Sequence, residues 1–411
     1  MKLNMLGFAV PLFVGFMLLE YLIAKKKKLP YFNLHNSIAN VSIGVAERLC
    51  DVFAAGMFYY VYDVIQKHYG LFHIQSSAVS IWIILFLLTD FIWYWYHRWG
   101  HEINLFWMAH IVHHQSEDYN YTTSARITLL QAVIRTSLWC ALPLLGFPAA
   151  MVTSLLLVHG LYPFFIHTQL IGKLGVLEYF LVTPSHHRVH HASNEEYLDK
   201  NYGDVLIIWD KLFGTFKKEE DTIVIQYGLT KPLKTYSFLW QHFHFAIELW
   251  LAIKQERNWK NKAKLVFSKP ETIDGTMRSK AESMCKVKQN SNEIDEPLNQ
   301  YVIWQMAVSL ILLFAFLLFE HYLILPIKIS FSIALLLTLI NCGAIMEQKR
   351  WIFLVELLRF IAVAFFSFYS FAFWKLKLLA IFLLLVLILT FYNSLKQLYL
   401  NYVYESRFGF N

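Results

Sequence analysis

Long apolar segments alternate with short polar ones along most of the chain. Nine segments are apolar over roughly the length that a helix needs to cross a bilayer, about 20 residues. They cover residues 6–24, 40–64, 80–96, 127–145, 147–166, 302–319, 322–345, 351–374 and 376–392. The second segment carries Glu47, Arg48 and Asp51, so we expect it to face the bundle interior or to lie partly in the interface. The pattern predicts an all-α, polytopic transmembrane helical bundle.

A polar stretch at residues 268–292 interrupts this pattern. It is rich in Lys, Ser, Glu and Asn and contains few bulky side chains, a composition that is typical of a linker. We therefore expect three parts. They are a membrane domain with the histidine motifs described below at residues 1–253, a basic polar linker at residues 254–300, and a C-terminal four-span block at residues 301–411.

The composition supports a membrane protein. Apolar residues make up 57% of the chain and charged residues 16%, against about 25% charged residues in ordinary soluble domains. Basic residues adjoin the apolar segments at residues 25–28, 254–288 and 349–350. The net charge of +7 therefore indicates contact with anionic headgroups and no nucleic-acid partner.

The basic segments also predict an orientation. Loops rich in Lys and Arg stay in the cytoplasm, and counting nine crossings from such a loop places all the histidine motifs on the cytoplasmic face. We expect this membrane to be the endoplasmic reticulum in a eukaryote or the inner membrane in a bacterium.

Three histidine motifs lie in the N-terminal half of the chain, with the patterns HxxxH, HxxHH and HxxHH. They consist of His97 and His101, of His110, His113 and His114, and of His187, His190 and His191. Imidazole is the commonest protein ligand of redox metals. On a helix the first and last His of HxxHH share a face and the middle one lies about 100° around it, a fan that suits two adjacent metals. We expect these eight histidines and His167, at the end of the fifth apolar segment, to bind metal.

The spacing also predicts local geometry around the motifs. His110 lies nine positions after His101, which on a continuous helix would put the two on opposite sides, so we expect a bend near residues 102–106. Asp90 lies seven positions before His97, on the same face of the predicted helix. We expect it to accept a hydrogen bond from the outer N–H of a ligand ring. His186 adjoins a motif that is complete without it, so we expect it beside the ligands. We expect His159 to be a hydrogen-bonded interior group.

The ligand set narrows the chemistry. A nitrogen-only site suits iron, copper or zinc, and so many ligands suit two ions. The four cysteines show no paired spacing, which excludes an iron–sulfur cluster. Two redox metals at helix ends beside a membrane favour activation of O₂ against a buried alkyl chain. Zinc hydrolases typically use about three protein ligands, and a metal transporter, the non-enzymatic alternative, needs ligands near the middle of the bilayer.

The sequence around the motifs resembles the fatty acid hydroxylase/sterol desaturase superfamily of membrane diiron enzymes, and within it the branch that cleaves ether lipids. The resemblance covers about residues 80–220. It rests on DFIWYWYHRWGHE (90–102), HIVHHQSEDYN (110–120), IHTQLI (166–171), TPSHHRVHHASN (183–194) and DKNYGDVLIIWDKLFGTF (199–216). The histidine motifs alone indicate only the superfamily, and the longer context is more specific.

The resemblance implies a monooxygenase with two iron ions, O₂ as co-substrate and tetrahydrobiopterin as electron donor. Its lipid substrate would be a 1-O-alkylglycerol, hydroxylated at the ether-linked carbon. The resulting hemiacetal collapses to a fatty aldehyde and glycerol. The resemblance makes Glu102, Tyr119 and Asn120 candidate catalytic residues, whereas the pterin-binding residues stay unknown. The alternative within the superfamily is a fatty acyl or sterol hydroxylase or desaturase that takes its electrons from a reductase.

Overall fold

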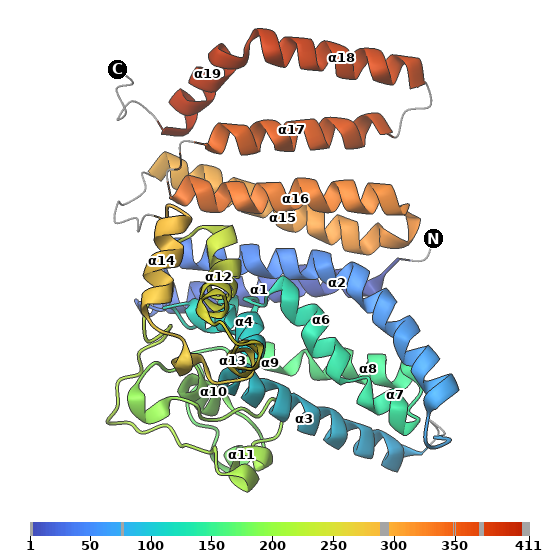
Figure 1. The fold of residues 1–411 in the computed structure, drawn as a ribbon, viewed down its shortest axis with the longest axis vertical. Coiled ribbons are helices and arrows are strands. Elements are labelled where there is room, and N and C mark those ends of the chain that lie inside the picture. The colour runs from blue at the N-terminus through green and yellow to red at the C-terminus, as the bar shows by residue number, and fades with distance from the viewer. Residues whose placement is uncertain are drawn as a thin grey trace. The chain divides into compact units, whose positions relative to one another are not determined.

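The computed structural model describes residues 3–74, 78–287, 296–347, 349, 351–369 and 374–404, and it is drawn in Figure 1. The predicted all-α fold is confirmed, since within these residues the only β-type pairings are two isolated bridges, Leu181 with Leu206 and Ala192 with Tyr227. The chain forms two compact units. One unit comprises Val14–Lys234 and Trp240–Gln289 and contains every predicted metal ligand. The other comprises Met1–Phe13, Thr235–Leu239 and Asn290–Asn411.

The helices follow one another along the chain with short connections. The α-helices up to residue 287 are α1 (Ala9–Lys26), α2 (Leu34–Tyr69), α3 (Val79–Glu102), α4 (Asn104–His110), α5 (Tyr121–Ser124), α6 (Leu129–Leu138), α7 (Ala141–Leu145), α8 (Ala149–His159), α9 (Tyr162–Ile166), α10 (Pro184–His190), α11 (Ile208–Phe213), α12 (Phe238–Gln255), α13 (Trp259–Val266) and α14 (Thr276–Met284). Those that follow are α15 (Glu296–Phe319), α16 (Leu325–Met346), α17 (Ile352–Tyr369), α18 (Trp374–Thr390) and α19 (Tyr392–Tyr404). The 3₁₀ helices are η1 (Met5–Phe8), η2 (Ile111–Gln115), η3 (Gly175–Tyr179), η4 (Glu195–Tyr197), η5 (Pro270–Thr272) and η6 (Glu320–Tyr322).

Five helical segments of the described residues are long and apolar enough to cross a membrane. They are Met5–Lys26, Val79–Glu102, Ala149–Ile166, Asn299–Tyr322 and Leu325–Met346. A sixth arises if Ile381–Thr390 and Tyr392–Tyr399, which meet at a bend of 74°, form one broken span. The nine predicted segments therefore exceed the candidate spans of the structure. Residues 370–373 of the predicted segment 351–374 lie outside the described residues.

Two of the other predicted segments differ for identifiable reasons. Residues 127–145 form two short helices, α6 and α7, because the ring of Pro143 would clash with the carbonyl of Trp139 in one continuous helix. Residues 40–64 lie inside α2, a helix of 36 residues, and its buried Glu47 pairs with Arg48. That helix is not among the candidate spans, and Glu47, Arg48 and Asp51 lower its mean hydropathy.

Parts of the predicted linker at residues 254–300 are helical. α13 and α14 lie within it, and α14 buries Met277 and Ala281 against neighbouring side chains of the same unit. Residues 288–295 of this stretch lie outside the described residues.

A core of apolar side chains holds the membrane helices of the histidine-bearing unit together. It lies between α2, α3 and α6–α8 and includes the fully buried Leu85, Trp139 and Leu142. The hydroxyl of Tyr62 in α2 donates a hydrogen bond of 2.7 Å to the carbonyl of Thr136 in α6. This core fixes α3, whose C-terminal end carries the first histidine motif.

The chain bends between α3 and α4, as predicted. α3 ends at Glu102, Ile103 is extended (φ −131°, ψ 122°), and α4 begins at Asn104. The buried side chain of Asn104 donates a hydrogen bond of 2.8 Å to the carbonyl of Leu265, which fixes the start of α4. The bend brings the second histidine motif back onto the first.

Candidate metal centre

Four short segments bring the predicted ligands together. His97 and His101 lie in the last turns of α3, His110 ends α4, and His113 and His114 lie in η2. His167 follows the last residue of α9. The third motif lies on α10 and the residue after it; α10 begins at Pro184, whose fixed φ and missing N–H suit the first position of a helix. Eight of the nine histidines are buried, and His101 is half-buried.

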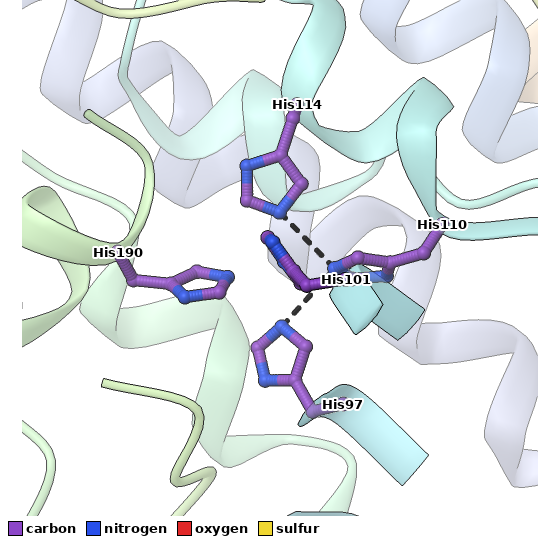
Figure 2. A group of neighbouring side chains, drawn as sticks. All are labelled: His97, His101, His110, His114 and His190. Atoms are coloured by element: carbon purple, nitrogen blue, oxygen red, sulfur yellow. Dashed lines mark hydrogen bonds between the residues drawn. The ribbon is translucent and has the colours of Figure 1, made fainter. Parts of the chain in front are cut away.

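Five of the histidines form cluster A, shown in Figure 2: His97, His101, His110, His114 and His190. One ring nitrogen from each lies within 4.8 Å of the others. The Nε2 atom of His110 is 3.1 Å from Nε2 of His97 and 3.1 Å from Nε2 of His114. The rings therefore converge on a common centre from three segments of the chain.

The other four form cluster B: His113, His167, His187 and His191. The Nε2 atom of His167 lies 3.2 Å from that of His113, 3.2 Å from that of His191 and 3.0 Å from that of His187. Each HxxHH motif thus divides between the clusters, with its outer pair in one and its middle histidine in the other. This is the fan that the helical spacing predicts.

The two clusters are adjacent. The rings of His114 in cluster A and His191 in cluster B are stacked, with centroids 4.4 Å apart. His113 and His114 follow each other in the chain and point into different clusters. Two ions held here would be close neighbours.

Both clusters fit a bound metal. Nitrogen atoms that ligate one first-row metal at about 2.1 Å are separated by about 3.0–3.4 Å, and the closest nitrogen pairs in both clusters match this spacing. Among the described residues, the buried Nε2 atoms of His101 and His190 have no hydrogen-bond partner. A buried polar atom without a partner costs about 1–3 kcal/mol, so an ion at cluster A would satisfy both atoms.

Backbone carbonyls orient four of the ligand rings through the outer nitrogen, Nδ1. The distances are 2.8 Å from His97 to Tyr202 O, 3.2 Å from His113 to Arg126 O, 2.5 Å from His167 to Pro163 O and 2.9 Å from His190 to Lys200 O. Donation from Nδ1–H leaves the Nε2 lone pair facing the cluster and raises its basicity. A carboxylate is placed similarly at a fifth ring, since Nδ1 of His101 lies 3.5 Å from Asp199.

The electrostatics of both clusters favour neutral imidazoles. Burial, followed by repulsion between neighbouring rings, lowers the pKa of His114 and His190 well below its ordinary value, and the same holds for His191. Burial also lowers the pKa of His167 to about 4. The neutral ring is the form that binds metal, so these ligands do not have to lose a proton at neutral pH.

Hydrogen bonds from Arg126 hold the segment that carries the second histidine motif. Arg126 is 2% exposed, and its guanidinium donates to the carbonyl of Val112, to Oδ1 of Asn40 and to Oε1 of Gln115. Gln115 in turn donates a hydrogen bond of 2.9 Å to His244. The residue that orients His113 through its carbonyl therefore also fixes the turn η2 through its side chain.

The three candidate catalytic residues occupy different surroundings. Tyr119 is buried, stacks on the ring of His167 in cluster B at 5.7 Å, and stacks on Tyr227 at 4.8 Å. Asn120 caps α5 and donates a hydrogen bond of 2.7 Å to the carbonyl of Tyr31. Glu102 pairs with Arg98 one turn earlier in α3, at 3.1 Å. Of the three, only Tyr119 stacks on a ligand ring.

Asp90 and His186 lie apart from the clusters. The Asp90 carboxylate is 2.8 Å from Nε2 of His159 and accepts hydrogen bonds from the backbone N–H of Val205 and Leu206 and from the indole of Trp209. The histidine that it orients is therefore His159, whose Nδ1 lies 2.9 Å from Asp204. His186 belongs to neither cluster, and its ring closes the capping box at the start of α10.

The segment that follows the third motif supplies contacts that spacing rules do not reveal. Lys200 and Tyr202 provide two of the orienting carbonyls. Asp210 holds this stretch by accepting hydrogen bonds of 2.7 Å from the N–H groups of Tyr202 and Gly203. The only sequence signal for it is the run of residues 199–216, which is part of the resemblance but contains no histidine.

Comparison with known proteins agrees with this geometry. The family described as Fatty acid hydroxylase matches residues 82–215, a range that contains all nine histidines. The chain is 36% identical over 361 residues to alkylglycerol monooxygenase of Homo sapiens, covering 85% of this chain and 80% of that protein. The alkylglycerol monooxygenases of Xenopus tropicalis and Danio rerio are 32% and 31% identical, each over 86% of this chain and 80% of the relative. No solved structure matches the chain.

Proposed function

Because the chain belongs to the fatty acid hydroxylase family, on the branch of the alkylglycerol monooxygenases, we propose that it cleaves the ether bond of 1-O-alkylglycerol lipids. It is an integral membrane monooxygenase that acts on ether lipids and depends on O₂. In the proposed reaction the carbon next to the ether oxygen is hydroxylated. The products are a fatty aldehyde and glycerol.

The observation that carries this proposal is the pair of adjacent, nitrogen-only clusters A and B. We propose that each cluster holds one iron ion through its histidines. When bound, the ions would supply the activation of O₂ and the oxidising power to remove a hydrogen from an alkyl carbon. The chain contributes neutral donors in fixed orientations, and the ring of Tyr119 stacks on His167 of cluster B and on Tyr227. We propose Tyr119 as the functional neighbour of this cluster.

The electron donor and the orientation are further parts of the proposal. Tetrahydrobiopterin as donor rests on the resemblance to the ether-lipid-cleaving branch. The cytoplasmic position of the clusters rests on the basic residues 25–28 after the first span, and it requires both α2 and α3 to cross the bilayer before His97. A soluble pterin would reach the clusters from that side.

The test uses membranes that contain the full chain, loaded with iron and supplied with O₂, tetrahydrobiopterin and a 1-O-alkylglycerol. We expect pterin-dependent release of fatty aldehyde, and no release from His113→Ala. Because His113 belongs to cluster B, this variant should keep about one bound ion, with the affinity of the other lowered by roughly 10- to 100-fold or more. Metal analysis and the aldehyde assay are made on the same membranes.

His68→Ala is the matched control, since His68 is an exposed histidine at the end of α2. It should keep both ions and full activity. If aldehyde release requires an added reductase system and does not require the pterin, tetrahydrobiopterin is not the electron donor. No aldehyde from membranes that hold two ions per chain would refute the ether substrate and direct the assay to fatty acyl and sterol substrates.

A further inference from the structure

Exposed apolar side chains gather in the loop of residues 171–180, between α9 and the third histidine motif. We call this segment the apolar loop. Its exposed apolar residues are Ile171, Leu174, Val176, Leu177, Tyr179 and Phe180. Val176 is 72% exposed and Tyr179 is 66% exposed. Single exposed apolar residues are normal on a protein surface, but six within ten positions mark a surface that contacts something apolar.

The charged side chains of the apolar loop, Lys173 and Glu178, are already paired within the protein. The Glu178 carboxylate accepts a hydrogen bond of 2.9 Å from the N–H of Leu174 and one of 3.3 Å from the hydroxyl of Thr183. Lys173 forms an ion pair of 2.5 Å with Asp221. Lys211 donates a hydrogen bond of 2.8 Å to the carbonyl of Tyr179. These contacts fix the backbone of the loop, while its apolar side chains stay exposed on the surface of the protein.

The position of the apolar loop, just after a candidate membrane span, indicates that lipid covers its apolar side chains. The candidate membrane span Ala149–Ile166 ends five residues before Ile171, so the chain has only just left the bilayer where the loop begins. Arg188 of α10 donates hydrogen bonds to the carbonyls of Thr168 at 3.1 Å and of Ile171 at 2.7 Å. The start of the loop is thereby fixed to the helix that carries the third motif, next to the end of a span.

We propose that the apolar loop inserts into the interfacial layer of the same bilayer, where the lipid itself covers Val176, Leu177 and Phe180. Tyr179 suits this position, because an aromatic ring with one polar atom is most stable at the level of the headgroups. Through Arg188, the loop then fixes the depth at which clusters A and B stand beside the lipid. The proposal is independent of the substrate and of the electron donor.

Spin-label accessibility tests it. The full chain, with the exposed Cys285 replaced by Ser, receives a nitroxide at Val176→Cys or at Leu177→Cys and is reconstituted in phosphatidylcholine vesicles. Val224→Cys is the matched control, since Val224 is an apolar residue of the same unit, 84% exposed, and lies three positions after a run of five charged residues, 217–221. Chain without an added Cys supplies the background, and metal content verifies that each variant is folded.

Nitroxides at Val176 and Leu177 should collide mainly with O₂, which concentrates in lipid, and their ratio of O₂ to water-soluble nickel collisions should exceed that at Val224 several-fold. Labels at Val176 and Leu177 that collide mainly with the nickel complex would overturn the proposal. Lipid-exposed labels at all three positions would also overturn it, because insertion would then not be confined to the apolar loop.

Discussion

The guanidinium of Arg126 is a cation buried without a carboxylate partner among the described residues. Burial lowers its pKa to about 9, so it stays protonated at neutral pH. Such a charge is costly to desolvate, and three neutral oxygens, from Val112, Asn40 and Gln115, offset the cost. A residue with this role joins α2, η2 and the segment before α6 at one point.

Arg126→Met should therefore be strongly destabilising. The substitution leaves three buried acceptors unsatisfied, and we expect the free energy of unfolding to fall by about 3 kcal/mol. Cluster B should lose metal as well, because the turn that carries His113 loosens. Denaturation in detergent and metal analysis measure the two effects. Arg257→Met, at an exposed position, should change neither; an Arg126→Met chain as stable as this control would contradict the assignment.

Gly100 lies where α3 packs against a ligand ring. A Cβ built at this position would lie 3.3 Å from Cγ of His110 and 3.4 Å from its Cδ2. Gly100→Ala should gain up to about 1 kcal/mol in helix propensity but displace the His110 ring by a few tenths of an ångström. We expect nearly unchanged stability together with roughly tenfold weaker metal binding at cluster A, measured by competition with a chelator.

Gly56→Ala is the control for this effect, because a Cβ added at Gly56 meets no atom within 4 Å. It should bind metal as the parent chain does. If Gly100→Ala and Gly56→Ala behave alike, the contact with His110 does not limit the geometry of cluster A.

At the scale of elements, the Asp90 carboxylate attaches residues 205–209, which follow the third motif, to α3. Asp90 binds His159 of α8, two backbone N–H groups and the indole of Trp209. The attached segment provides the carbonyls that orient His97 and His190. Asp90 therefore acts on cluster A through the backbone of residues 200–206, without contacting the rings of the cluster.

Asp90→Asn tests this attachment. An amide has one acceptor oxygen in place of two and presents N–H groups to neighbouring donors, so we expect a loss of about 3 kcal/mol in unfolding free energy. Metal affinity at cluster A should fall about tenfold while cluster B is less affected. Asp51→Asn in α2, where the carboxylate is 32% exposed, is the control. If metal affinity falls equally at both clusters, Asp90→Asn destabilises the whole unit and does not act specifically on cluster A.

The element scale also shows what the sequence can predict. The bend at Ile103 and the division of each HxxHH motif follow from helical spacing, which acts over a few residues. The break between α6 and α7 has a local signal in Pro143, which hydropathy averaging over a window obscures. The attachment of residues 205–209 to Asp90 joins positions more than 100 residues apart, and two of its three donors are backbone N–H groups. Contacts of that kind leave no pattern in the sequence.

At the scale of the whole molecule, the two clusters bring together histidines from distant segments of the histidine-bearing unit. Their ligands come from α3, α4, η2, the end of α9 and α10, so bound ions join segments that are distant in sequence. Without ions, nine imidazoles stand close together in a buried space, two of them with unpaired Nε2 atoms in the described structure. Metal binding and folding of this unit are therefore linked.

Removal of metal should lower the unfolding temperature. At an ion concentration about 1,000 times its dissociation constant, binding stabilises the folded state by about 4 kcal/mol, which corresponds to a shift on the order of 10 °C. The thermal unfolding of the detergent-solubilised chain is measured before and after treatment with a chelator and after iron is returned. A transition that does not move would mean that the clusters bind no metal with useful affinity.

The orienting carbonyls of Tyr202, Arg126, Pro163 and Lys200 have a consequence for mutational tolerance. A carbonyl is present whatever side chain its residue bears, so the tautomers of His97, His113, His167 and His190 are encoded in the path of the backbone. A replacement such as Lys200→Ala that preserves this path leaves the ring orientation intact. The metal centre should thus tolerate many single substitutions at these positions. An insertion or deletion that shifts the backbone should disrupt it.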